Sequence, residues 1–435
     1  KKVNPMGDDV LVRNGYFAPV GDIQFGLDEN GNDAISIITD VTVGENGIYT
    51  ILDTRENRLF TYSANGELLY AFSGKGNQIG NTNSPVAVTY QGTDLLVLDK
   101  LNGSLTVFQQ TEYGALISKV LDMYGKFQYE ESVEVWQQVL SLNANFDIAY
   151  DGIGSSYLSM GNYEKAMEYF SYSNNKDAYS DAYKESRNQF LQQYILVIVL
   201  IIAVLLFGLI KLMQWIGKRN RDEKYREKRD KFSGHLLYGF YVLMHPFDGF
   251  YDLKHEKRGS LGAATFWLMA GVSGVVLSKV FTSYLFNTTY KQDVSIPWEY
   301  LTLLIPLGLW VASNWCITTL VDGEGRFKDI YLFTGYAMLP VALLYFISIP
   351  VSYMLVSDEG MYLNLLQNIA LIWFVFLIFC GNTVIHQYTG AKSILAILIS
   401  ILGIAIMIFV ALLLITSYQK LASVVIDIGK ELSYR

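Results

Sequence analysis

The chain has 435 residues, of which 51% are hydrophobic, 17% are charged and two are cysteines. Two cysteines cannot form a disulfide framework or a cysteine-rich zinc site, which excludes small disulfide-stapled and zinc-finger proteins. The net charge of −8 conceals an asymmetry, because residues 1–193 carry 25 acidic and 13 basic side chains whereas residues 216–260 carry 7 and 11. Local charge therefore reports on membrane sidedness better than the total does.

Residues 37–110 contain two copies of a pattern in which apolar and polar residues alternate between turns rich in Gly and Asn. Asp53 recurs as Asp99 and Tyr62 as Phe108, at a period of 46 residues. The alternation predicts short antiparallel strands, and a period of about 40–50 residues with several strands is typical of a propeller blade. We expect both aspartates to accept hydrogen bonds from turn amides rather than to bind a metal.

Residues 40–69 run in the order strand, Asp, Asn-Arg, strand and Asn-Gly, which resembles the NHL class of propeller repeat. The second copy departs from this pattern at Leu101-Asn102-Gly103. The resemblance implies a partial β-propeller of extracytoplasmic blades over residues 1–111. Two blades cannot close a propeller, which needs about four. We therefore expect residues 1–36 to supply part of a third blade, and further sequence to precede Lys1.

A second repeat follows at a spacing of 34 residues, with Tyr129, Ser132 and Trp136 recurring as Tyr163, Ala166 and Phe170. This pattern resembles the tetratricopeptide repeat, which implies α-helical hairpins over residues 112–193. Such repeats present docking surfaces, and the candidate residues are Tyr150, Tyr157 and Tyr163. The alternative is that these helices only bury the edge of the strands and connect them to the membrane.

Six segments hold the roughly 20 apolar residues that a helix needs to cross a bilayer. They are residues 194–215, 261–286, 298–320, 330–356, 363–385 and 391–416. We expect an anchor helix over 194–216 and a bundle of five helices over 261–418. The fourth segment contains Pro340 and Pro350, which predict a kink. Ala270 and Gly274 form a small-xxx-small face that allows close packing between helices, within the chain or in a dimer.

Lysine and arginine gather in the loops after the first, third and fifth segments. The first of these loops is the basic segment 217–260, and the others contain Arg326, Lys328 and Lys392, whereas the intervening loops contain only Lys291. The positive-inside rule therefore predicts a multi-pass protein of the cell membrane with its basic loops in the cytoplasm. The N-terminal domain and the tail 419–435 are then extracytoplasmic, which requires an export signal upstream.

Two stretches of these loops, residues 245–254 and 322–330, carry a second resemblance. Five spans with a Pro-x-x-Gly-Phe entry and a Gly-x-Gly-x-Phe-Lys-Asp segment resemble the Yip family of membrane domains over about 245–420. The resemblance implies a non-enzymatic domain that engages other proteins. Bacterial proteins that join such a domain to NHL-like and tetratricopeptide-like repeats resemble nearly the whole chain, which implies an association with carbohydrate-type ABC importers.

The candidate residues for contact with a cytoplasmic partner are Pro246, Asp248, Gly249, Asp252, Gly323, Gly325, Arg326 and Asp329. We expect Gly323 and Gly325 to permit a tight turn and Arg326 to pair with Asp329. The candidate residues for helix packing are Ala270, Gly274 and Pro340.

Catalytic, metal-binding and cofactor-binding residues are not indicated by the sequence. The four histidines, His235, His245, His255 and His386, do not cluster on one helix face, and Gly323-x-Gly325 lacks the lysine of a phosphate-binding loop. The favoured function is a non-enzymatic scaffold or accessory subunit, with importer permeases, a solute-binding protein and the bilayer as partners and no nucleic acid. The alternatives are a stand-alone solute receptor or carrier, and a membrane enzyme whose active site lies in upstream sequence.

Overall fold

The computed structural model describes residues 2–11, 36–221, 231–287 and 294–433. Its contacts divide the chain into two compact units, Lys1–Phe190 and Leu191–Arg435, which we describe separately. Most of the expected third blade, part of the basic segment 217–260 and Lys291 lie outside the described residues.

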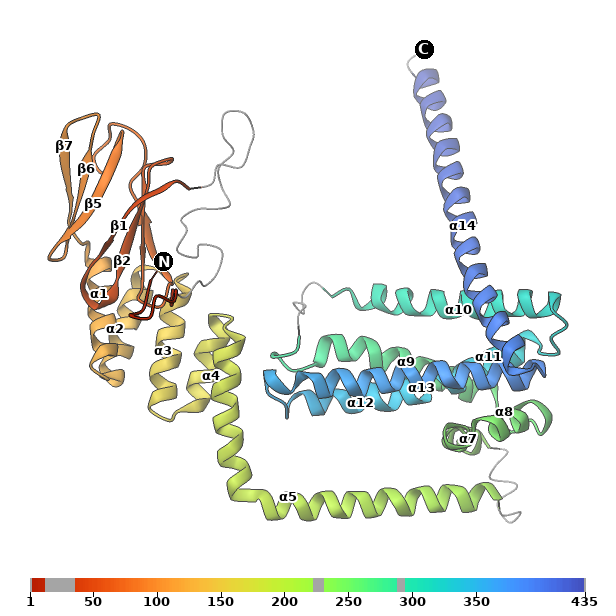
Figure 1. Ribbon diagram of the computed structural model, residues 1–435. Coiled ribbons are helices and arrows are strands. Elements are labelled where there is room, and N and C mark those ends of the chain that lie inside the picture. The colour runs from red at the N-terminus through yellow and green to blue at the C-terminus, as the bar shows by residue number, and fades with distance from the viewer. Residues whose placement is uncertain (1, 12–35, 222–230, 288–293, 434–435) are drawn as a thin grey trace. The chain divides into compact units, whose positions relative to one another are not determined.

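Unit 1 begins with two small antiparallel sheets (Figure 1). The first has the order β1-β2-β3-β4, and the second has the order β5-β6-β7. The strands are β1 (Ile38–Val43), β2 (Tyr49–Asp53), β3 (Arg58–Tyr62), β4 (Leu68–Phe72), β5 (Pro85–Gln91), β6 (Asp94–Asp99) and β7 (Ser104–Phe108). The prediction of short antiparallel strands is therefore confirmed. The described residues contain no closed propeller.

The two sheets are joined through side chains of β1. Asp40 Oδ2 accepts the backbone N–H of Val88 at 2.8 Å, and Thr42 Oγ1 accepts the N–H of Tyr90 at 3.2 Å. Polar contacts of this kind satisfy the edge of β5 without extending one sheet into the other.

Asp53 and Asp99 both hold turns, as the sequence predicts. Asp53 Oδ1 accepts the N–H groups of Ile37 and Arg55, each at 2.9 Å. The buried Asp99 accepts four backbone N–H groups at 2.6–3.2 Å. Burial of Asp99 raises the pKa of its carboxyl group, but these four hydrogen bonds outweigh burial and hold the pKa below its usual range.

Four helices follow, each packed on the next: α1 (Glu112–Gly125), α2 (Tyr129–Leu142), α3 (Asp147–Ser159) and α4 (Tyr163–Tyr172). Glycines set the close contacts. A Cβ atom on Gly152 would overlap the Trp136 indole, and one on Gly154 would lie 2.7 Å from the Phe170 ring. Large aromatic side chains thus fill space that two glycines leave open on α3.

Unit 2 is helical, and it begins within α5 (Lys176–Arg221). The other helices are α7 (Phe232–Met244), α8 (Pro246–His255), α9 (Leu261–Phe281), α10 (Ile296–Leu320), α11 (Phe327–Ala337), α12 (Leu339–Ser352), α13 (Gly360–His386) and α14 (Gly390–Ser433). Six described segments are long and apolar enough to cross a membrane, as predicted. They are Lys176–Leu212, Leu261–Phe281, Ile296–Leu320, Phe327–Ser352, Ser357–His386 and Gly390–Val424.

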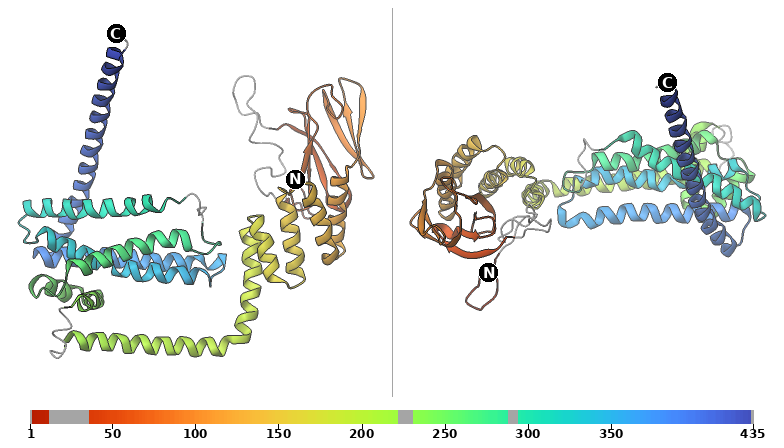
Figure 2. Two further views of the ribbon diagram at one scale, coloured as in Figure 1. Left: turned by 180° about the vertical axis from the view of Figure 1, so that it is seen from behind. Right: turned by 90° about the horizontal axis from the view of Figure 1, so that it is seen from above.

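Helices α9, α11, α12 and α13 run side by side and form the core of the bundle (Figure 1; Figure 2). Small residues bring α9 close to α11 and α12. A Cβ atom on Gly274 would lie 3.2 Å from Cβ of Tyr345, and one on Gly271 would lie 3.1 Å from the Met338 carbonyl oxygen. The packing role predicted for Gly274 is therefore met inside the chain, where the half-buried Ala270 also packs against the core.

Pro340 divides the fourth span, as its position predicts. α11 ends at Ala337 and α12 begins at Leu339, with Met338 between them. Proline lacks the N–H that would bond to the carbonyl of the residue four before it, so the helix cannot continue unbroken through this point. The buried Pro340 occupies the first turn of α12, where that N–H is not needed.

Gly335 lies at the closest approach that a glycine makes to the backbone of another described helix. A Cβ atom there would lie 2.5 Å from the Ala264 carbonyl oxygen of α9, and backbone atoms cannot turn aside as a side chain can. We predict that Gly335→Ala destabilises the bundle by about 1–3 kcal/mol, as overpacking does. Thermal unfolding in detergent micelles measures this change. Gly308→Ala on α10 is the control, because nothing lies within 4 Å of that position; equal stability of the two variants would contradict the packing described.

Candidate functional site

The loop between α10 and α11 lies against the end of α13. A Cβ atom on Gly323 would lie 2.6 Å from Tyr388 Oη and 2.7 Å from His386 Nδ1, and one on Gly325 would lie 2.5 Å from His386 Cε1. Neither glycine has a positive φ, whereas Asp322 has a φ of 55°. The left-handed residue of this turn is therefore Asp322, and the two glycines leave room for two side chains.

Five buried polar side chains form what we call the His386 cluster: Asn314 on α10, Asn382 and His386 on α13, and Ser393 and Ser400 on α14. Asn314 Nδ2 donates to Asn382 Oδ1 at 3.1 Å and to Ser400 Oγ at 3.2 Å. Asn382 Nδ2 donates to Ser393 Oγ at 2.9 Å. The cluster thus ties three membrane-spanning helices together by hydrogen bonds, where packing alone gives little specificity.

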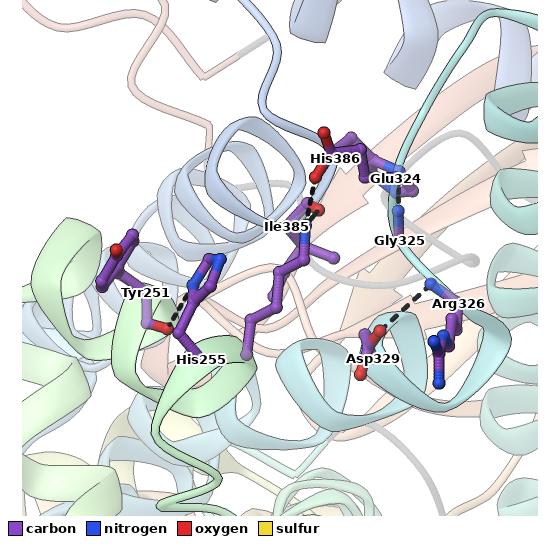
Figure 3. Close-up of polar contacts among 9 residues, drawn as sticks. Tyr251, His255, Glu324, Gly325, Arg326, Asp329, Ile385 and His386 are labelled. Carbon is purple, nitrogen blue, oxygen red and sulfur yellow. Dashed lines mark hydrogen bonds and ion pairs between the residues drawn. The ribbon is translucent and has the colours of Figure 1, made fainter.

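The hydrogen bonds assign one tautomer to His386. The backbone N–H of Gly325 donates to His386 Nδ1 at 3.2 Å, so this nitrogen carries no proton (Figure 3). The proton is then on Nε2, which donates to Asn314 Oδ1 at 3.3 Å. A neutral imidazole therefore forms hydrogen bonds with both the loop and α10. In a charged imidazole Nδ1 would carry a proton, and this second donor would face the Gly325 N–H.

Helix α8 is attached to the same end of the bundle through Lys254. Its Nζ donates to the Ile385 carbonyl oxygen at 2.9 Å and to Glu324 Oε2 at 3.0 Å; both acceptors are labelled in Figure 3. The lysine side chain is only 14% exposed. A cation at the C-terminal end of α13 also meets the negative end of the helix dipole. The two stretches that carry the Yip resemblance are therefore joined directly.

The predicted partner-contact residues are mostly turned into the fold. Asp248 and Arg326 are exposed, whereas Gly249 and Gly325 are buried and the other four are intermediate. Asp252 accepts the Tyr238 hydroxyl at 2.9 Å, and a Cβ atom on Gly249 would lie 2.8 Å from the Val242 Cα. A partner that touched this end of the bundle would thus meet Asp248 and Arg326 first, and partner contact stays a prediction.

The expected ion pair of Arg326 with Asp329 is not the contact that forms. Asp329 Oδ2 accepts the backbone N–H of Arg326 at 3.1 Å, which caps the first turn of α11 (Figure 3). The carboxylate thus satisfies a helix N-terminal amide. The guanidinium of Arg326 points away from this contact in the same view.

Two of the predicted docking tyrosines of unit 1, Tyr150 and Tyr157, are linked through the rings of Tyr172 and Tyr169. Tyr150 lines a shallow cavity of about 350 Å³ with Tyr172, and its hydroxyl donates to the Ala144 carbonyl oxygen at 3.0 Å. The ring of Tyr157 lies under the Lys165 ammonium, 5.0 Å from it. Tyr163 starts α4 and is partly exposed. Docking at these residues likewise stays a prediction.

A larger cavity, which we call the intersheet cleft, was not indicated by the sequence. It has a volume of about 480 Å³, and its aromatic lining comes from four elements: Tyr70 and Phe72 on β4, Tyr90 on β5, Phe108 on β7 and Tyr113 on α1. Its remaining lining contains the amides Asn81, Gln109 and Gln110 and no charged side chain. Pockets of this size, mainly apolar with a few polar groups, are typical of ligand sites.

The hydroxyls of Tyr70 and Tyr90 in the intersheet cleft stay uncharged. Burial, followed by the nearby Tyr90, raises the pKa of Tyr70 to about 12. Burial also raises the pKa of Tyr90, whose hydroxyl lies 2.6 Å from Thr50 Oγ1. The cleft can therefore stack on and hydrogen-bond an uncharged ligand. Among the residues that the structure describes, no three His, Cys, Asp or Glu side chains gather to hold a metal.

Six helices among the described residues are long and apolar enough to cross a membrane, which indicates a multi-pass membrane protein. Residues 240–412 match the family model described as the Yip1 domain, and this part of the chain is a Yip1 domain. The resemblance inferred from residues 245–420 is thus confirmed for the membrane domain. No curated protein matches the chain.

The His386 cluster gives a direct test of how the spans are held. We predict that Asn314→Leu lowers bundle stability, because Asn382, Ser400 and His386 each lose a partner. Buried orphaned groups cost about 1–3 kcal/mol, although polar contacts in membranes average about 0.6 kcal/mol. Unfolding by denaturing detergent measures the loss, with Asn368→Leu at an exposed position of α13 as the control. A double-mutant cycle of Asn314→Ala and Asn382→Ala that gave no coupling would refute the cluster.

Proposed function

We propose that this protein is a non-enzymatic scaffold or accessory subunit of a larger membrane complex. The observation that carries the proposal is the state of α14. Leu412, Leu413, Leu414 and Ile415 point to all sides of the helix, because successive residues are about 100° apart. Their side chains are 50–66% exposed, so no helix of the described structure covers any face at this level. Figure 1 shows α14 leaving the bundle. A span of this kind suits a neighbouring membrane protein as well as lipid.

The first part of α14, by contrast, is packed against the bundle. Ser393, Ala396 and Ser400 are buried, and the Ser313 hydroxyl donates to the Ser400 carbonyl oxygen at 2.7 Å. The helix is therefore held at the end of the bundle, and the described residues leave its remainder uncovered. This arrangement holds a bare helix at a defined angle for a partner, which supports a scaffold role.

We propose further that unit 1 is an extracytoplasmic binding module. The positive-inside asymmetry supports this sidedness, and the intersheet cleft supports binding of a solute or of a short uncharged protein segment. The sheets are taken as consecutive NHL-type blades, because Asp53 and Asp99 hold equivalent turns in each. The helices α1–α4 are taken as tetratricopeptide-like hairpins, because each packs on the next.

The partners proposed are permease subunits of a carbohydrate-type ABC importer and its solute-binding protein, as the sequence resemblance implies. A stand-alone receptor or carrier is the second candidate, and the intersheet cleft favours it as much as it favours an accessory subunit. An enzyme whose active site lies in upstream sequence is the third.

Purification of the chain from its native membrane in mild detergent, followed by mass spectrometry, separates these functions. We predict recovery of permease or ATPase subunits at fixed stoichiometry. Isolation as a lone species that takes up solute in liposomes would contradict the scaffold role, as would hydrolytic activity in a longer form of the chain.

The bare part of α14 offers matched variants for this experiment. Ile408→Ala with Leu412→Ala changes one side of the helix, and Val410→Ala with Leu414→Ala changes nearly the opposite side. Both pairs stay apolar, so membrane insertion is retained. A partner covers one face only, so one pair should reduce its recovery and the other should not. Unchanged recovery with both pairs would show that α14 is not the contact.

A further inference from the structure

Helix α7 is apolar but too short to cross a bilayer. It has 13 residues and would span about 20 Å, against a hydrocarbon thickness of about 30 Å. Apolar helices of this length are buried in a core or lie at the membrane interface. α7 is not fully covered, because Phe232 and Met244 at its ends are 53% and 63% exposed.

The orientation of α7 differs from that of the spans. Figure 1 shows α7 nearly end-on while α9, α12 and α13 run across the view, and Figure 2 shows the same relation from behind. A helix that is crosswise to these three helices and too short to cross a bilayer suits a place at the membrane interface. Its position beside the end of the bundle is fixed by two hydrogen bonds, from Trp267 Nε1 to the Leu236 carbonyl and from the Tyr336 hydroxyl to the His235 carbonyl.

The apolar surface of α7 continues that of α9. A Cβ atom on Gly262 would lie 3.3 Å from the Phe232 ring, so this ring covers the first turn of α9. The Phe240 ring meets Trp267 edge-on at 5.8 Å, and Trp267 in turn meets Phe266 at 5.3 Å. Phe266 is 47% exposed on the outside of the bundle. One belt of aromatic rings therefore runs from the outer face of α9 onto α7.

Helix α8 extends the belt with one exposed face. Phe247 and Tyr251 lie one turn apart and are 48% and 54% exposed, while Phe250 and Leu253 on the other face are buried. The Tyr251 ring stacks on His255 at 4.2 Å. Aromatic rings with a polar tip beside ionisable groups are typical of the layer between acyl chains and headgroups.

We propose that the α7–α8 hairpin is an interfacial element that lies in the headgroup layer of the bilayer. Phe232, Met244, Phe247 and Tyr251 insert toward the acyl chains, and the partner is a phospholipid surface. Lys257, beyond the end of α8, stays on the water side. The inference goes beyond the proposed function and is independent of it, since it needs no partner protein and holds for either sidedness.

Spin labels in single-protein nanodiscs of phosphatidylcholine test this placement. Phe247→Cys, Tyr251→Cys and the matched control Lys257→Cys are made in a Cys316→Ser and Cys380→Ala background, with Met244→Cys in reserve. All four label positions are exposed, so labelling removes little packing. The ratio of collisions with oxygen to collisions with a water-soluble nickel chelate should be severalfold higher at 247 and 251 than at 257.

Equal ratios at the three positions would overturn the proposal, because the hairpin would then face water. The proposal would also be overturned if the ratio of oxygen to nickel-chelate collisions stayed high in lipid-free detergent and the protein there had twice the mass of a monomer. A second copy of the chain would then cover the belt. Loss of the permease partners in purification would leave these ratios unchanged, so failure of the proposed function is distinguished from failure of this one.

Discussion

The packing of the membrane domain depends on glycines that let helix backbones approach each other closely. In a bilayer no hydrophobic force draws one helix to another, so packing and hydrogen bonds must do so. Gly335 lets α11 meet the backbone of α9 at Ala264, and Gly271 and Gly274 let α12 follow the same helix. Because α11 is held there, the loop before it is held too, and the Gly325 N–H comes within reach of His386.

That loop concentrates the polar groups of unit 2 at one end of the bundle. His386 accepts from the loop and donates to α10, Asn382 joins α13 to α14, and Lys254 joins α8 to the last turn of α13. These three side chains each donate to a different element, which fixes the relative position of the elements more precisely than apolar contact does. The opposite arrangement holds along α14, where the distal residues contact nothing in the described structure. One end of the domain is thus cross-linked by hydrogen bonds, and the distal part of α14 is left uncovered.

The sequence predicts the parts that depend on local pattern. Apolar runs give the six spans, the alternation around Asp53 and Asp99 gives the strands, and Pro340 gives the break in the fourth span. The features that the sequence does not predict depend on contacts between residues far apart in the chain. The four histidines look unrelated along the chain, and His386 acquires its role only because Asn314 and Gly325 come from other elements. The glycines of the loop were expected to serve the turn, but they make room for His386 and Tyr388. The intersheet cleft arises between two sheets and a helix, and no single repeat contains its pattern.

The proposed function requires unit 1 and the loop between α10 and α11 to lie on opposite sides of the membrane. Single cysteines at Asn65 in unit 1 and at Lys328 beside the α10–α11 loop, in a background without native cysteines, can be labelled in intact cells with a membrane-impermeant maleimide. This sidedness predicts labelling at position 65 without treatment and at position 328 only after the membrane is permeabilised. Labelling at 328 but not at 65 in intact cells would contradict it.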